Sequence, residues 1–115
     1  MEELTRESVG EILKKFKEEL RRIPGDKFVK LILFGSFARG DHKFGSDIDV
    51  LLVVKEEPTE EEELKISLLT TDMSLTHDIV ISCFTYPYDA FQKWETPFLM
   101  NIRREGINIL KRKKQ

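Results

Sequence analysis

Residues 31–54 read LILFGSFARGDHKFGSDIDVLLVV and contain the pattern that decides the fold. An apolar segment ends at Gly35 and Ser36, a short polar segment follows, and Asp47 and Asp49 begin a second apolar segment. Short apolar runs bounded by Gly and polar turn residues are typical of buried β-strands. The stretch therefore predicts two strands joined by a tight turn and a polar loop, with two carboxylates at the start of the second strand.

The two aspartates are separated by Ile48, so on a strand both carboxylates lie on one face, roughly 7 Å apart along the chain. Beyond them the segment is apolar on both faces, which is typical of a central strand covered on two sides. Carboxylates in such a place are costly unless a cation or hydrogen-bond donors compensate. Mg²⁺ prefers oxygen ligands and keeps substrate phosphates in its shell. We interpret Asp47 and Asp49 as a magnesium site, the alternative being a solvated strand start.

The Gly35-Ser36 pair adds a place for phosphate. Gly35 lacks a Cβ, so the backbone can turn sharply and approach a ligand, and Ser36 can cap a following helical turn whose N–H groups meet phosphate oxygens. By itself a Gly-Ser pair is an ordinary turn signal. Combined with the carboxylates, it predicts a site for a nucleoside triphosphate and its metal ions.

Two further polar residues are candidates for nucleotide binding. Ser46 precedes the first aspartate and can orient it by a hydrogen bond, although serine before a strand is also a common turn residue. Arg39 follows Ser36 by one helical turn and can contact phosphate or acceptor, or form a surface salt bridge. Both alternatives stay open for each residue.

The segments GSFARG and SDIDVLLVV resemble the signature of the polymerase-β-like nucleotidyltransferase superfamily. The sequences of these two segments, in so short a chain, resemble the minimal nucleotidyltransferases of that superfamily, the MNT proteins. Gly35, Ser36, Asp47 and Asp49 match the family motif, and the ending FLMNIRREGINIL adds a weaker similarity. The resemblance implies an α/β (α+β) fold with a mixed β-sheet flanked by helices, and residues 1–115 as one minimal nucleotidyltransferase domain.

The family has a third carboxylate on a later strand, and Asp78 in THDIVISCF is the matching position. The resemblance thus implies that Asp47, Asp49 and Asp78 hold two Mg²⁺ ions, with Asp78 also a candidate base toward the acceptor hydroxyl. Val80 and Ser82 leave the face of Asp78 mixed, so the alternative is a strand-end aspartate hydrogen-bonded to a turn.

The activity implied by the resemblance is transfer of AMP from ATP to a hydroxyl, with release of pyrophosphate. In the MNT group the acceptor is a tyrosine of a HEPN toxin, which the MNT protein silences as its antitoxin. The alternatives are a non-catalytic antitoxin that blocks its partner sterically, and a transferase that modifies a small molecule or an RNA end. The last is disfavoured because relatives with those activities usually carry an additional domain. An oligomer is expected only through the partner.

Composition limits the class of protein. The 115 residues are 40% hydrophobic and 35% charged, and no apolar run approaches the length of a membrane span. With 21 acidic and 19 basic residues, general attraction to nucleic acid is disfavoured. The N-terminus lacks a signal-peptide core and Cys83 has no partner for a disulfide. A cytoplasmic location is therefore expected.

Hydrophobic periodicity and turn signals predict an alternating order of elements. Helices are expected over residues 5–22, 59–74 and 97–105, with a single helical turn at 36–39. The helix over 59–74 begins with a capping box, and the last helix ends before Gly106. The expected strands cover residues 28–34, 47–54, 76–84 and, at an edge, 107–110, with a turn at 86–88. Tyr86, Tyr88, Phe91 and Trp94 are interpreted as core or partner interface, with base stacking as the alternative.

Overall fold

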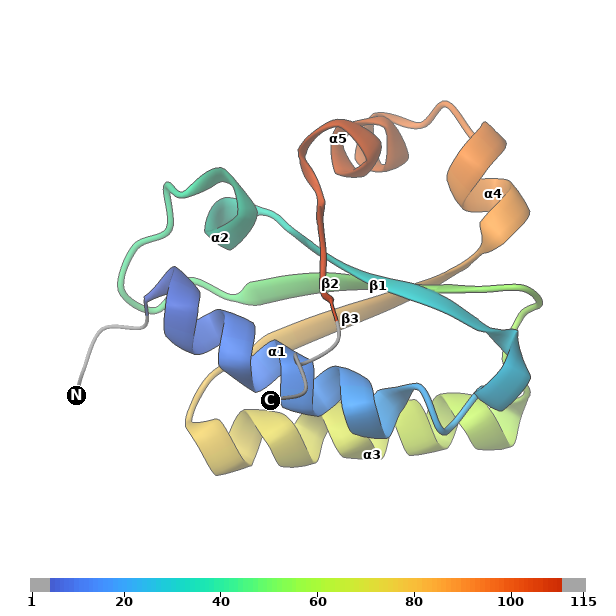
Figure 1. Ribbon diagram of the computed structural model, residues 1–115, viewed down its shortest axis with the longest axis horizontal. Coiled ribbons are helices and arrows are strands. Elements are labelled where there is room, and N and C mark those ends of the chain that lie inside the picture. The colour runs from blue at the N-terminus through green and yellow to red at the C-terminus, as the bar shows by residue number, and fades with distance from the viewer. Residues whose placement is uncertain (1–4, 111–115) are drawn as a thin grey trace.

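The computed structural model describes residues 5–110 as a four-stranded mixed sheet between two layers of helices (Figure 1). β1 (Phe28–Phe34) pairs antiparallel with β2 (Ile48–Val54) on one side and with β4 (Ile107–Asn108) on the other. β3 (Ile81–Pro87) is parallel to β2, which gives the order β3-β2-β1-β4. The predicted mixed sheet flanked by helices is confirmed.

Two long helices, α1 (Arg6–Leu20) and α3 (Glu60–His77), cover one face of the sheet (Figure 1). Each begins with a capping box, in which a threonine and the residue three positions later bond each other's backbone N–H. Between them and the sheet lies the larger hydrophobic core, which includes Leu13, Phe16, Val50 and Leu52. No helix in residues 5–110 has the length and apolarity to cross a membrane.

The other face of the sheet carries the shorter helices α4 (Tyr88–Lys93) and α5 (Pro97–Glu105) (Figure 1). Leu99 and Ile102 of α5 are buried against the sheet in a second core cluster. A single turn, α2 (Ser36–Arg39), follows β1, and a 3₁₀ turn, η1 (Gly25–Lys27), precedes it. The cap at Thr96 and the stop at Gly106 agree with the expected bounds of the last helix.

The expected strand over residues 76–84 is wrong in its first part. Thr76 and His77 continue α3, and Asp78 ends it in the left-handed conformation with φ 52°. The backbone N–H of Ile79 then returns to the Ser74 carbonyl, a bond that closes the helix end. Strand pairing begins only at Ile81, because packing of α3 along the sheet extends the helix beyond the residue where local propensity ends it.

The expected turn over residues 86–88 is also wrong. β3 continues to Pro87, and a short helix, α4, starts at Tyr88. Proline lacks an N–H and fits the start of a helix, where no intrahelical partner is needed. Burial of Ala90 and Phe91 stabilises this helix against the sheet. The tertiary contact thus decided between a turn and a helix.

Cys83 lies on the β3 face that packs against the larger core. Burial raises the pKa of its thiol to about 12, while a hydrogen bond with Thr70 acts in the opposite direction. The thiol therefore stays protonated at neutral pH, as is typical of a structural cysteine in a core.

Candidate functional site

Gly35 lies where β1 ends and α2 begins. Its backbone angles, φ 78° and ψ −157°, belong to a region that residues with a Cβ rarely adopt. A Cβ built on Gly35 would lie 2.4 Å from Oδ2 of Asp49. The glycine therefore permits the turn after β1 and also leaves room for the Asp49 carboxylate.

Asp47 and Asp49 reach one cavity from the start of β2. Asp47 is exposed and precedes the strand, whereas Asp49 is half-buried within it, level with Phe34 of β1 and Ser82 of β3. The cavity has a volume of about 450 Å³ and is lined by Phe34, Gly35, Ser36, Arg39, Ser46, Asp47, Asp49, Phe98, Asn101, Ile102 and Glu105. Of the residues that the sequence predicts to bind metal or nucleotide, all but Asp78 line this cavity.

Burial and the nearby charge of Asp47 both oppose ionisation of the Asp49 carboxyl. Burial raises the pKa of the Asp49 carboxyl above its ordinary value, and the charge of Asp47 raises it further, while Arg39 acts in the opposite direction. A divalent cation would stabilise the ionised form of both groups. Their oxygens are the hard donors that Mg²⁺ prefers, together with phosphate oxygens. The residues present therefore fit a magnesium ion carried with a nucleotide.

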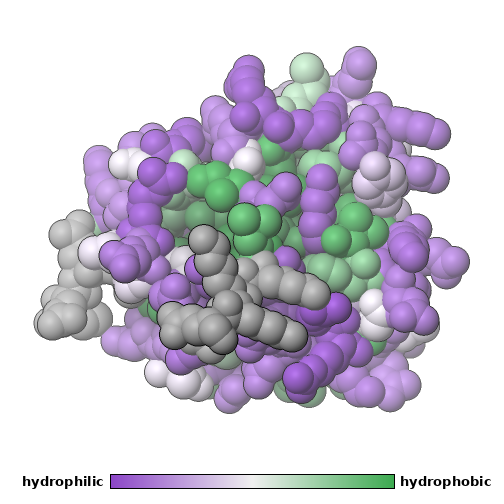
Figure 2. Space-filling view, in the orientation of Figure 1, coloured by the Kyte–Doolittle hydropathy of each residue, from purple (hydrophilic) through white to green (hydrophobic). Residues whose placement is uncertain are grey.

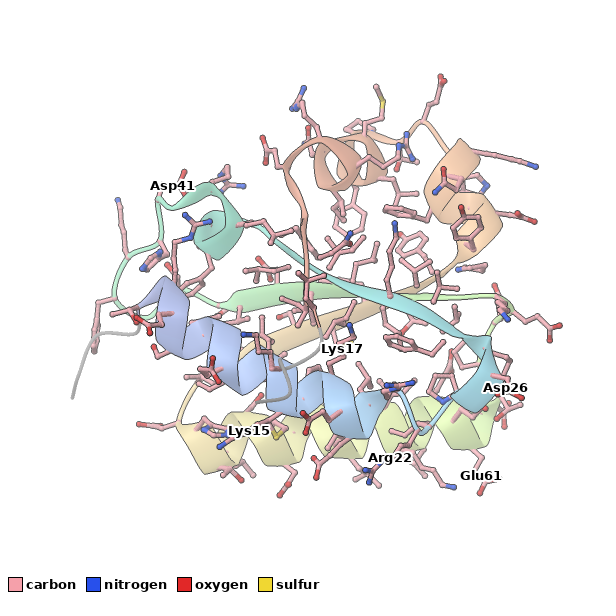
Figure 3. The ribbon with its side chains drawn as sticks, viewed as in Figure 1. Lys15, Lys17, Arg22, Asp26, Asp41 and Glu61 are labelled. Atoms are coloured by element: carbon pink, nitrogen blue, oxygen red, sulfur yellow. The ribbon has the colours of Figure 1, made fainter. Side chains whose placement is uncertain are left out.

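Arg39 lies at the end of α2 between two acidic groups. Its Nε is 3.2 Å from Oδ2 of Asp41, and its Nη1 is 3.7 Å from Oε2 of Glu105. The hydrogen bond with Asp41 is the main reason that the pKa of the guanidinium is raised. Figure 3 shows Asp41 on the loop that follows α2. Arg39 thus forms the salt bridges expected as one alternative and also lines the cavity, while its contact with phosphate or acceptor stays a prediction.

Ser46 fixes the turn that precedes the first aspartate. Its Oγ accepts a hydrogen bond from the backbone N–H of Lys43 at 2.8 Å, and its own N–H donates to the Lys43 carbonyl at 2.9 Å. The side chain also lines the cavity beside Asp47. The turn position that was one alternative for Ser46 is thus present, while its orienting hydrogen bond to Asp47 stays a prediction.

Asp78 is not brought together with the other carboxylates. It caps the end of α3, is exposed, and is absent from the residues that line the cavity. The β3 residue level with Asp49 is Ser82. Within residues 5–110 no group of three or more His, Cys, Asp or Glu side chains is arranged to hold a metal ion. The expected strand position of the third carboxylate is thus wrong, because the helix extends through that segment.

The sequence did not indicate that α5 would form part of the cavity. Phe98, Asn101, Ile102 and Glu105 all line it. Their spacing of three, four and seven residues places them on one face of the helix. That periodicity is visible in the sequence, but only the docking of α5 across the sheet shows that this face meets Gly35 and the aspartates.

Of the aromatic residues interpreted as core or partner interface, Phe91 belongs to the second core cluster and Tyr86 packs against it. Phe91 is buried in the core beneath α4, and Tyr86 contacts Trp94 with ring centroids 6.2 Å apart. None of the four lines the cavity. The rings that border it are Phe34 and Phe98, with centroids 5.4 Å apart. Figure 2 shows hydrophobic surface in the middle of the visible face, between α1 and α5, surrounded by hydrophilic side chains.

Comparison with known proteins gives a family match over most of the chain. Residues 13–107 match the family described as nucleotidyltransferase domain. The chain is 40% identical over 99 residues to a Methanocaldococcus jannaschii protein with the provisional name protein adenylyltransferase MJ0141, covering 86% of this chain and 96% of the relative. A second protein of that organism, MJ0604, has the same provisional activity and is 32% identical over 97 residues, covering 82% and 90%.

Solved structures share the fold at low sequence identity. A toxin–antitoxin complex with AMP-PNP gives a TM-score of 0.60 at 16% identity, covering 86% of this chain and 73% of that chain. A nucleotidyltransferase from Sulfolobus solfataricus gives 0.57 at 20% identity, covering 93% and 84%. A complex of a tri-AMPylated Shewanella oneidensis HEPN toxin with an MNT antitoxin gives 0.56 at 14% identity, covering 90% and 73%. These similarities confirm the fold class.

Proposed function

Because the chain belongs to the nucleotidyltransferase domain family, we propose that it transfers AMP from ATP to a hydroxyl of a protein partner and thereby acts as an antitoxin. The observation that carries this proposal is the shared cavity of Gly35, Ser36, Asp47 and Asp49. Phosphoryl-type transfer asks the protein mainly to position groups and to neutralise charge. A cavity in which the carboxylate pair lies beside the turn at Gly35 and Ser36 can position a triphosphate and, with a bound cation, neutralise its charge.

Each residue of the cavity has a separate task in this proposal. Asp47 and Asp49 would hold Mg²⁺, which when bound neutralises charge on the phosphate oxygens. Gly35 keeps the backbone clear of Asp49, and the N–H groups that follow it would donate to the triphosphate. Arg39 lines the same cavity and supplies a positive charge for a phosphate oxygen. We propose one ion between Asp47 and Asp49, since the described residues contain no group of three or more His, Cys, Asp or Glu side chains arranged to hold a metal ion.

The acceptor we propose is a tyrosine of a HEPN toxin encoded with this chain, modified in the cytoplasm. Asp47 is exposed at the cavity, so a side chain carried by another protein can approach the bound nucleotide. The provisional name of MJ0141 is protein adenylyltransferase, and one structural neighbour is an MNT antitoxin with an AMPylated HEPN toxin. These relatives support a protein acceptor over a small molecule or RNA.

One observation favours a second candidate, an antitoxin that blocks its partner sterically. The carboxylate expected at the third position of the site, Asp78, lies outside the cavity. A chain that only binds its partner would not need that group.

The experiment that separates the two candidates is modification of the partner. The neighbouring HEPN-type protein is incubated with ATP, Mg²⁺ and this chain, and its intact mass is measured. We expect an adenylyl mass increment with the wild type and none with Asp47→Asn or Asp49→Asn. Lys65→Ala, on the exposed part of α3 and outside the cavity, is the matched control. An unmodified partner that is nevertheless neutralised by all variants would establish the steric alternative.

A further inference from the structure

The cavity has two chemically different parts. Gly35, Asp47 and Asp49 offer carboxylates and a close backbone, which suit phosphates and a metal ion. The face of α5 offers an aromatic ring at Phe98, an amide at Asn101, the apolar Ile102, and Glu105. If the phosphates of a nucleotide lie beside the carboxylates, the base of the nucleotide would contact the α5 side of the cavity. On the basis of the proposed function, we propose that this face is the nucleobase subsite and that Asn101 selects adenine.

Phe98 has the properties of a stacking platform. Its ring meets Phe34 edge-on at 5.4 Å and Phe84 edge-on at 5.5 Å, and lies 5.9 Å from Tyr86. Contacts on several sides hold the ring in one orientation, so stacking on it costs little conformational entropy. The side chain is half-buried and borders the cavity. Aromatic rings placed in this way stack any base, so Phe98 accounts for affinity and not for selection.

Asn101 can distinguish one base from another. Its Oδ1 accepts a hydrogen bond from Nη2 of Arg104 at 2.7 Å, which fixes the orientation of the amide. A second lone pair remains on Oδ1, and within residues 5–110 the amide nitrogen donates no hydrogen bond. The side chain is exposed at the cavity. A donor and an acceptor are therefore presented side by side to a ligand.

This pair of groups matches adenine. The carboxamide of asparagine accepts from the N6 amine of adenine and donates to the adjacent ring nitrogen. Guanine has a carbonyl oxygen in place of that amine, so it would place an acceptor against Oδ1 of Asn101. Arg104 is then a positioning residue, because it acts on the base only by orienting Asn101.

The test compares ATP, GTP and inorganic tripolyphosphate, each with Mg²⁺, by calorimetric titration of the full chain. We expect the wild type to bind ATP at least about tenfold more tightly than GTP. Asn101→Ala removes this preference and leaves the tripolyphosphate affinity unchanged. Asn101→Asp reverses the preference toward GTP, because a carboxylate accepts from the guanine N1–H and N2 amine. Met100→Ala, exposed on α5 outside the cavity, keeps the wild-type ratio.

The outcomes are distinguishable from failure of the proposed function. Equal affinity of the wild type for ATP and GTP overturns the subsite, as does an unchanged ratio in Asn101→Ala. In either case Mg²⁺-dependent binding of tripolyphosphate that Asp49→Asn abolishes leaves the phosphate and metal site standing. If neither ATP nor tripolyphosphate binds the wild type, the proposed function fails together with the inference.

Discussion

Substitution of Gly35 by alanine tests the geometry on which the site depends. The added Cβ would lie 2.4 Å from Oδ2 of Asp49, whereas an ordinary van der Waals contact is about 3.5 Å. Either the Asp49 carboxylate or the turn after β1 must therefore move by about 1 Å. Backbone strain at this positive φ adds about 1–3 kcal/mol to the cost. We expect both the stability and the site to suffer.

The backbone strain of about 1–3 kcal/mol corresponds by itself to a decrease in Tm of roughly 5–20 °C for a chain of this size, and the close contact with Asp49 adds to that decrease. A displacement of about 1 Å at a reacting centre costs on the order of 100-fold in rate. Thermal unfolding followed by circular dichroism measures the first quantity, and the rate of partner modification below Tm measures the second. Mg²⁺-dependent ATP binding should weaken in parallel.

Gly45→Ala is the matched control for this substitution. Gly45 also has a positive φ, of 83°, but an added Cβ would meet no atom within 4 Å. Its replacement should therefore lower Tm through backbone strain alone and leave the modification rate nearly unchanged. Equal rates for the two alanine variants, after correction for folded fraction, would refute the proposed contact between residue 35 and Asp49.

Three further predictions concern charged residues. Without Mg²⁺, Asp49→Asn should raise Tm at pH 7, because the raised pKa of Asp49 means that its ionised carboxyl destabilises the fold. The gain in Tm should vanish below about pH 4, where the Asp49 carboxyl of the wild type is also protonated. A lower Tm of Asp49→Asn than of the wild type in EDTA would contradict this prediction. Glu62→Gln keeps the capping box but loses the ion pair with Lys27, whose hydrogen bond is the main cause of the lowered pKa of Glu62. Its stability deficit in urea titrations should be full at pH 7 and shrink as the pH falls below about 4.5 through that lowered pKa; a deficit independent of pH would rule out the ion pair as its cause. Asp78→Gly relieves the left-handed cap of α3 and should stabilise the fold by up to about 1 kcal/mol with transfer intact. Loss of transfer with a retained fold would instead restore Asp78 as a metal ligand.

Most elements could be predicted because their signals are local. The strand over 28–34, the turn at 36–39 and the capping box at Thr59 depend on residues within a few positions of one another. The site residues Gly35, Ser36, Asp47 and Asp49 could be predicted for the same reason. They lie at the end of β1 and the start of β2, which follow each other in the sequence and pair in the sheet.

The errors occurred where local signals conflict with packing. The segment from Thr76 to Asp78 can continue a helix or begin a strand, and burial of α3 against the sheet decided for the helix. Pro87 and Tyr88 fit a turn equally well as the start of α4, and burial of Phe91 decided for the latter. In each case the deciding contact is with residues distant in the sequence.

By itself the sequence determined the paired strands, the glycine turn and the carboxylates between them, because strand periodicity and the absence of a Cβ are properties of neighbouring residues. Tertiary packing determines which helix face completes the cavity and which carboxylate stays outside it. Asn101 and Glu105 join the site, and Asp78 does not. The physical reason is that the docking of α5 and the length of α3 are set by burial of apolar side chains against the whole sheet.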